Sequence, residues 1–184
     1  MTSRGVSRRL FTQSLGVVIA TFVLKPGPGL GQSPSNLPFS LRNNRRLEGW
    51  IRIDPDGTVL VFTGKAELGQ GILTALAQIA AEELDVELQT VRVISADTSR
   101  GPDEQYTYGS QSVEQSGSAI RAASAEARGV LLAAAARRFG VHTDDLKIKN
   151  GTIATPDGKQ ATFWEIAKED PDILRRDIAA AAAP

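Results

Sequence analysis

The chain has 184 residues, of which 41% are hydrophobic and 5% aromatic, and its formal net charge at pH 7 is zero. This length and apolar content suit one domain of ordinary size, and the lack of a basic stripe interleaved with aromatic residues argues against a nucleic-acid partner. The chain has no cysteine and a single histidine, which excludes disulfides, iron–sulfur ligation, cysteine nucleophiles and histidine-rich metal sites within it.

The first predicted element is an export signal over residues 1–31. It contains the twin-arginine pattern Ser-Arg-Arg-Leu-Phe at residues 7–11, and an apolar run of ten residues follows at 15–24. Such a run suits a signal peptide and is too short for a membrane-spanning helix, which needs about 20 residues. We therefore expect a periplasmic protein exported by the twin-arginine route, held at the membrane only if the signal is left uncleaved. The alternative is a basic, disordered leader.

Residues 32–46 are polar, contain two prolines and are interpreted as a linker. The folded domain is expected to span residues 47–168. Its first strands are predicted near Trp50–Ile53 and at Thr58–Thr63, where apolar and β-branched residues predominate. The intervening Asp-Pro-Asp-Gly is a turn sequence, because proline presets φ and glycine accepts a positive φ. These two strands should therefore form a hairpin.

A helix is predicted from Ile72 to Leu84, where apolar residues recur at spacings of three and four. A third strand follows at Val91–Ser95. Residues 97–112 are polar and form a loop whose length is typical of functional or mobile segments. A long alanine-rich helix is then predicted over residues 113–139, ending at Gly140.

The last predicted elements are a hairpin and a short helix. Strands at 146–149 and 152–154 flank Asn150-Gly151, a strong two-residue hairpin turn. Thr162 and Glu165 have the spacing of a capping box at the start of a helix over 163–167. Residues 169–184 show no core-forming pattern and are interpreted as a tail. The order of elements predicts an α+β fold, a mixed sheet with helices packed on one face.

Two loops carry residues suited to ligand binding, and the first is the stretch that contains Gly69, Gln70 and Gly71. The glycines allow a backbone to approach a ligand closely, and the helix that follows would offer unpaired N–H groups suited to phosphate. The glutamine adds an amide donor and an acceptor. Spacing alone favours the simpler alternative, a glycine turn with a solvent-facing glutamine. The pattern is neither a Rossmann fingerprint nor a P-loop, because it lacks their further glycine and Gly-Lys-Ser/Thr elements.

The second loop carries Gly109, Ser110, Gln111 and Ser112 just before the long helix. Hydroxyls, an amide and helix-start N–H groups in one place predict a cradle for anions and hydrogen-bonding ligands. The alternative is an ordinary helix start in which Ser112 caps the helix and the other residues are solvated. The residues alone leave both alternatives open.

The segments VFTGKAELGQG (61–71), which continues through ILTALAQIAAEELDV, and TYGSQSVEQSG (107–117) resemble pterin-contacting segments of the large subunits of the xanthine dehydrogenase and aldehyde oxidase family. The arrangement is most similar to that of the isoquinoline 1-oxidoreductase and nicotinate dehydrogenase types, and the resemblance covers roughly residues 46–165. It implies a molybdopterin-binding type of α+β domain. It further implies that Gly69, Gln70 and Gly71 contact the molybdopterin, and that residues 109–112 bind its dinucleotide or pyranopterin part.

The same resemblance implies a molybdenum hydroxylase acting on an N-heteroaromatic or aldehyde substrate, with molybdopterin cytosine dinucleotide as cofactor and an iron–sulfur small subunit as partner. Large subunits of the family are longer and take a glutamate base from a glycine-rich region that has no counterpart here. We therefore expect no catalytic residue in this chain, Glu67 and Glu104 included, and a further chain that supplies the rest of the large subunit. The alternatives are a truncated, non-catalytic remnant and a periplasmic small-molecule-binding module.

Overall fold

The computed structural model describes residues 37–178, so the expected export signal lies outside the described residues. A mixed sheet of order β1-β2-β3 is built from β1 (Ile51–Ile53), β2 (Val59–Thr63) and β3 (Val91–Ser95). β1 runs antiparallel to β2, and β3 runs parallel to it. The predicted hairpin is confirmed: its turn is closed by a hydrogen bond of 2.8 Å from the Asp54 N–H to the Thr58 carbonyl, with Gly57 at φ 93°.

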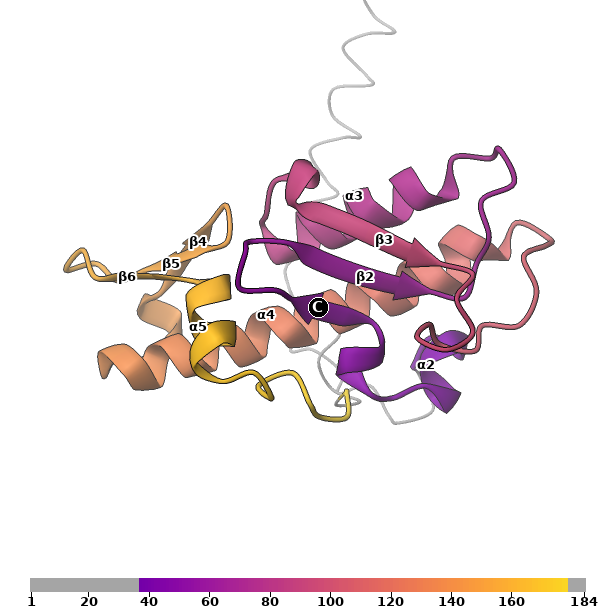
Figure 1. The fold of residues 1–184 in the computed structure, drawn as a ribbon. Helices are drawn as coiled ribbons and strands as arrows, with labels where there is room; N and C mark the ends of the chain where they lie inside the picture. The colour runs from indigo at the N-terminus through magenta and orange to yellow at the C-terminus, as the bar shows by residue number, and fades with distance from the viewer. Residues whose placement is uncertain (1–36, 179–184) are drawn as a thin grey trace, which may run out of the picture. The chain divides into compact units, whose positions relative to one another are not determined.

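Two helices cover one face of this sheet, as predicted. α3 (Ile72–Leu84) connects β2 to β3, α4 (Ser118–Phe139) follows β3, and both lie behind the sheet in Figure 1. The strands supply alternate residues to the core because successive side chains point to opposite faces. Val59 and Val61 join the core beneath the helices, whereas Phe62 points to the other face, where the Arg52 guanidinium lies 6.0 Å from its ring centre.

The long helix begins differently from the prediction. Residues Ser112–Gly117 form a π-helical turn, η4, and regular α-helix begins at Ser118. The π turn is pressed closely against α3: a Cβ added at Gly117 would lie 3.0 Å from Cδ1 of Ile79. π turns within helices are often found beside functional sites, and this one begins at Ser112, the last residue of the second predicted ligand loop.

A second sheet departs from the single sheet that we expected. It is antiparallel and consists of β4 (Lys147–Lys149), β5 (Thr152–Ala154) and β6 (Gln160–Thr162). The predicted turn between β4 and β5 is confirmed, with Asn150 at φ 49° and Gly151 at φ 71°. β6 was not predicted because it is only three residues long and contains a single apolar residue, which gives no alternating pattern.

The short helix α5 (Phe163–Glu169) carries the predicted capping box. The Glu165 N–H donates to the Thr162 hydroxyl at 3.2 Å, and the Thr162 N–H donates to the Glu165 carboxylate at 2.7 Å. Short 3-10 turns complete the described elements, namely η2 (Leu47–Gly49), η3 (Leu88–Thr90) and η5 (Thr143–Asp145). None of the helices in residues 37–178 is long and apolar enough to cross a membrane.

Parts of the expected linker and tail belong to the fold. A helix, α2 (Phe39–Asn43), lies within the segment interpreted as a linker, and Leu41 is fully buried. In the segment interpreted as a tail, Leu174 and Ile178 join the core. The two segments pair through backbone hydrogen bonds of 2.8 Å, one from the Leu47 N–H to the Arg176 carbonyl and one from the Ile178 N–H to the Arg45 carbonyl. Each segment has few apolar residues among polar and charged ones, and for this reason neither was predicted to join the core.

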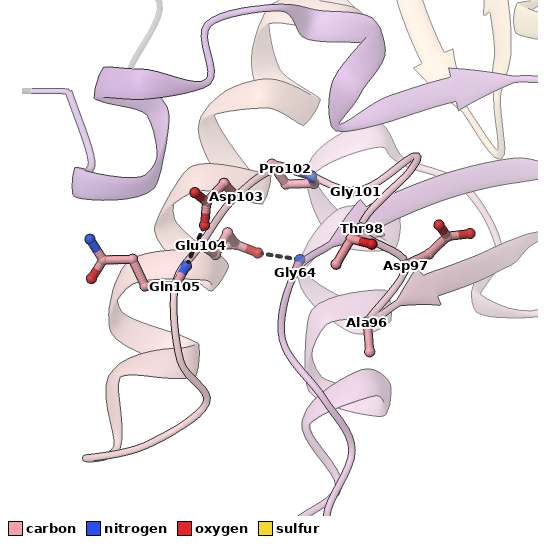
Figure 2. Close-up of a pocket in the computed structure, with 9 residues that line it drawn as sticks. All are labelled: Gly64, Ala96, Asp97, Thr98, Gly101, Pro102, Asp103, Glu104 and Gln105. Atoms are coloured by element: carbon pink, nitrogen blue, oxygen red, sulfur yellow. Dashed lines mark hydrogen bonds between the residues drawn. The ribbon is translucent and has the colours of Figure 1, made fainter.

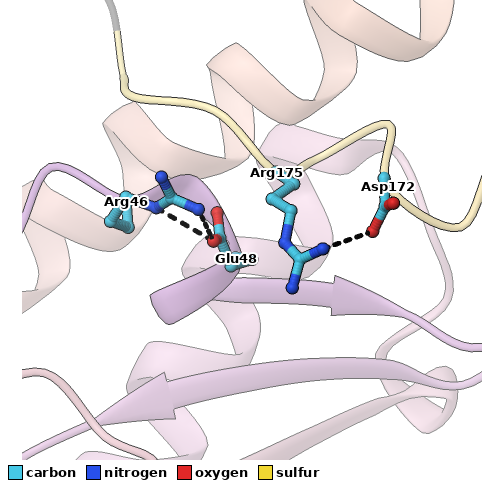
Figure 3. Close-up of polar contacts among 4 residues, drawn as sticks. All are labelled: Arg46, Glu48, Asp172 and Arg175. Atoms are coloured by element: carbon cyan, nitrogen blue, oxygen red, sulfur yellow. Dashed lines mark hydrogen bonds and ion pairs between the residues drawn. The ribbon is translucent and has the colours of Figure 1, made fainter.

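Polar contacts at the surface accompany this pairing. Arg46 forms an ion pair with Glu48, and Arg175 forms one with Asp172 at 3.1 Å (Figure 3). All four side chains are at least about a third exposed, and ion pairs of this kind typically contribute little to stability. The buried leucine and isoleucine side chains therefore hold the segments in place more than these charges do.

Candidate functional site

The two predicted ligand loops leave the same edge of the central sheet. Because β2 and β3 are parallel, residues 64–71 and 96–111 both begin at the carboxyl ends of their strands (Figure 1). Such edges are where ligands bind in many open sheets with parallel strands. The loops lead into α3 and η4, and these two helices contact each other. The topology thus brings both predicted loops to one end of the sheet.

In the first loop, the carboxylate of Glu67 caps the start of α3. It accepts hydrogen bonds from the N–H groups of Gly69 at 2.8 Å, Gly71 at 2.9 Å and Leu73 at 3.2 Å. These hydrogen bonds lower the pKa of Glu67 below its ordinary value, and the bond from the Gly71 N–H contributes most. The helix start that was expected to offer free N–H groups to phosphate is therefore partly satisfied by the chain's own carboxylate.

Gln70 closes the same loop. Its side-chain oxygen accepts from the Leu68 N–H at 2.5 Å, and its amide nitrogen donates to the Ala66 carbonyl at 2.9 Å. The glutamine is exposed at the surface, yet both ends of its amide are used within the loop. Gly69 and Gly71 have φ values of 94° and 75°, which favour glycine, and both are exposed. A ligand would meet the surface of a loop that is already closed by hydrogen bonds.

The second loop leaves its side-chain donors free, while the Gln111 backbone N–H donates to the Tyr108 carbonyl at 3.3 Å. Within residues 37–178, the side chains of Ser110, Gln111 and Ser112 have no hydrogen-bond partner, and Ser112 does not cap the helix. Gly109 and Ser110 both adopt left-handed conformations, with φ values of 62° and 59°. The N–H groups of a first helical turn lack partners within the helix. Two hydroxyls, an amide and these N–H groups form a donor set that fits a phosphate-bearing or hydroxyl-rich ligand.

A group of buried polar residues, which no sequence pattern indicated, joins the two loops. Thr63 and Lys65 lie at the end of β2, and both are at most 1% exposed. Glu104, at 3% exposure, accepts hydrogen bonds from the Thr63 hydroxyl at 2.5 Å and from the Gly64 N–H at 2.9 Å. The Ala66 N–H donates to the Thr107 hydroxyl at 2.9 Å. The available clue was a lysine two residues after a strand of predominantly apolar sequence, VLVFT.

A cavity of about 360 Å³ lies beside these residues (Figure 2). One oxygen of Glu104, Oε1, is buried without a hydrogen-bond partner within the described residues. A hydrogen bond from the Ser99 hydroxyl and a weaker contribution from the Arg100 side chain lower the pKa of Asp97 to about 2. No group of three or more His, Cys, Asp or Glu side chains placed to hold a metal ion occurs in residues 37–178. The cavity is lined by Gly64, Ala96, Asp97, Thr98, Gly101, Pro102, Asp103, Glu104 and Gln105.

Residues 7–181 of the chain match the molybdopterin cofactor-binding domain family. The chain is 39% identical over 124 residues to one of the subunits of nicotinate dehydrogenase from Pseudomonas putida, an alignment that covers 67% of this chain and 10% of that protein. It is 36% identical over 170 residues to the beta chain of isoquinoline 1-oxidoreductase from Brevundimonas diminuta, covering 88% of this chain and 22% of that protein. The chain thus spans between a tenth and a quarter of the length of these relatives.

Solved structures show the same fold. The CO dehydrogenase of Oligotropha carboxidovorans matches with a TM-score of 0.57 and 31% identity, over 64% of this chain and 15% of that chain. Quinoline 2-oxidoreductase of Pseudomonas putida 86 matches with a TM-score of 0.53 and 27% identity, over 72% of this chain and 17% of that one. Both alignments concern a small part of a much longer chain.

Proposed function

Because the chain belongs to the molybdopterin cofactor-binding domain family, we propose that it forms one wall of the cofactor site of a molybdenum hydroxylase. The observation that carries this proposal is the set of unpaired side-chain donors of Ser110, Gln111 and Ser112, at the same sheet edge as the glycine loop of residues 64–71. Serine hydroxyls, an amide and unpaired N–H groups are the groups that bind phosphate and sugar oxygens.

In this proposal the two loops have different tasks. Ser110, Gln111 and Ser112 donate hydrogen bonds to the dinucleotide or pyranopterin part of the cofactor, and Gly109 leaves room for its approach. Gly69, Gln70 and Gly71 contact the molybdopterin as a preformed surface, since Glu67 and the amide of Gln70 already hold the loop closed. Preformed loops spare the ligand the entropic cost of ordering them.

The bound cofactor would supply the redox chemistry of hydroxylation, and this chain would bind and orient it. We propose the cytosine dinucleotide form of the cofactor and an N-heteroaromatic or aldehyde substrate. The partner that we propose is an iron–sulfur small subunit. The names of relatives support this assembly, since several of them are subunits or chains of larger enzymes.

The cofactor site is tested by a matched pair of glycine variants. Gly69 and Gly158 have similar φ values of 94° and 90°, and no atom would lie within 4 Å of a Cβ added at either position. Valine therefore strains both backbones alike, but only Gly69→Val changes the proposed contact surface. In the chain purified with its partners, we expect Gly69→Val to lower molybdenum and nucleotide content about tenfold or more, as changes beside a metal site commonly do. Gly158→Val should retain both, and equal contents in the two variants would contradict the assignment.

We further propose that the protein acts in the periplasm after export by the twin-arginine route. The support is the sequence pattern around Arg8 and Arg9, which a receptor reads as an address. Replacing both arginines with lysine keeps the charge and removes the pattern. We expect that variant to accumulate in the cytoplasm, as judged by cell fractionation, and undiminished periplasmic protein would overturn the proposal.

A further inference from the structure

We propose that Lys65 and Glu104 are positioning residues, which hold the second ligand loop in the path that its donors need. This inference rests on the proposed function of residues 109–112. It concerns side chains to which neither the sequence pattern nor the cofactor contacts gave a role.

Lys65 fixes the backbone just before the second loop. Its ammonium group is buried and donates to the carbonyl of Glu104 at 2.7 Å and to the carbonyl of Tyr106 at 2.8 Å. No carboxylate within the described residues lies within 4.0 Å of it. A buried ammonium without an ion-pair partner is costly, so it is a poor device for stability alone. The ammonium group does hold the carbonyl oxygens of Glu104 and Tyr106 close together, and so it fixes the backbone conformation of residues 104–106.

Glu104 ties the same segment back to the sheet. The Glu104 Oε2 accepts hydrogen bonds from the Thr63 hydroxyl and the Gly64 N–H. The Glu104 carbonyl accepts one from the Lys65 ammonium, and the Thr107 hydroxyl accepts one from the Ala66 N–H. Residues 63–66 are thus joined in sequence order to residues 104–107, and side-chain atoms take part in every bond. Gly109 follows two residues later. The close approach at Gly64, where an added Cβ would lie 2.5 Å from the Pro102 carbonyl oxygen, leaves this segment little freedom to shift.

Apart from a hydrogen bond of 2.8 Å from the Asn44 amide to the Asp103 carbonyl, little else holds the second loop. Between residues 103 and 112, Glu104 is the buried residue, and Tyr106 and Tyr108 are 77% and 59% exposed. A segment without buried apolar side chains has low local stability. Its conformation therefore depends on the hydrogen bonds of Lys65 and Glu104, whereas the hydrophobic core contains neither residue.

The test compares Lys65→Met and Glu104→Gln with Lys147→Met, which removes an exposed ammonium from β4. In the full chain purified with its partners, amide hydrogen exchange is followed by mass spectrometry, and molybdenum and nucleotide contents are measured. Loss of a buried hydrogen bond should speed exchange of residues 104–112 about tenfold, with exchange in α3 and α4 unchanged. Cofactor content should fall about tenfold in the same variants, and Lys147→Met should match the unaltered chain.

Two results would overturn the inference. One is unchanged exchange of residues 104–112 in both variants. The other is accelerated exchange throughout α3 and α4 in both variants, because Lys65 and Glu104 would then act on global stability. If the unaltered chain holds no cofactor, the proposed function fails, and the exchange comparison still decides whether these residues position the loop.

Discussion

Glu67 shows how one side chain changes what a ligand loop can do. The sequence predicted a glycine-containing loop between β2 and α3, and the positive φ values of Gly69 and Gly71 explain why glycine occurs at these positions. It did not indicate that a carboxylate two to six residues earlier would turn back onto three N–H groups. Such a return depends on the path of the whole loop, for which the spacing of residues gives no rule.

The hydrogen bonds of Glu67 make the closure of the first loop depend on pH. Because these bonds lower its pKa in the folded chain, the ionised carboxylate stabilises the closed loop above its ordinary pKa of about 4.5. This stabilisation is lost as the pH falls through the lower, folded value. We expect the protection of the Gly69, Gly71 and Leu73 amides against hydrogen exchange, relative to an unstructured peptide, to decline over that acidic range.

The control for this expectation is Glu67→Gln, whose neutral amide should give lower protection at neutral pH and little change on acidification. A second variant, Glu87→Gln, alters an exposed glutamate outside the loop and should behave as the unaltered chain does. An identical acid response in the chain with Glu67 and in Glu67→Gln would show that another group controls the loop.

Elements with strong local signals were predicted well. α3 and β3 have the predicted limits, and the Asn150-Gly151 turn and the capping box of α5 are present. Each depends on residues within a few positions of one another. β6 and the π turn at Ser112–Gly117 were not predicted, because the first is short and the second reflects contact with α3.

The capping box gives a test at the scale of one element. Thr162→Ala removes the hydroxyl that accepts the Glu165 N–H, and should lower the free energy of unfolding by about 1 kcal/mol. Urea unfolding followed by circular dichroism measures this change. Thr143→Ala, in a 3-10 turn where the hydroxyl forms no cap, should cost less than half as much, and equal losses would refute the role of the box.

For the molecule as a whole, the sequence predicted the central sheet and its helices. It did not predict that the first and last segments of the described residues pair with each other. Residues 45–47 pair with residues 176–178, far away in the sequence. No local pattern predicts such a contact, since each partner is a short segment with isolated apolar residues. The joining of residues 63–66 to residues 104–107 was missed for the same reason.

The buried end of the described chain yields a prediction of stability. Leu174 is 6% exposed and belongs to the core, so Leu174→Ala should lower the free energy of unfolding by about 2–4 kcal/mol. Leu88, at 41% exposure, offers the matched control, and Leu88→Ala should change stability by at most about 0.5 kcal/mol. Comparable losses from the two substitutions, measured by chemical denaturation, would mean that residues 171–178 do not contribute to the core.

The central claim is that this chain forms part of a molybdenum cofactor site, and the most direct test is the composition of the protein as isolated from its native host. Molybdenum, bound nucleotide and co-purifying chains should be measured together on the same sample. We predict molybdenum and a cytosine nucleotide in equal amounts, with an iron–sulfur subunit that co-purifies. A chain isolated alone, without metal or nucleotide, would contradict the account.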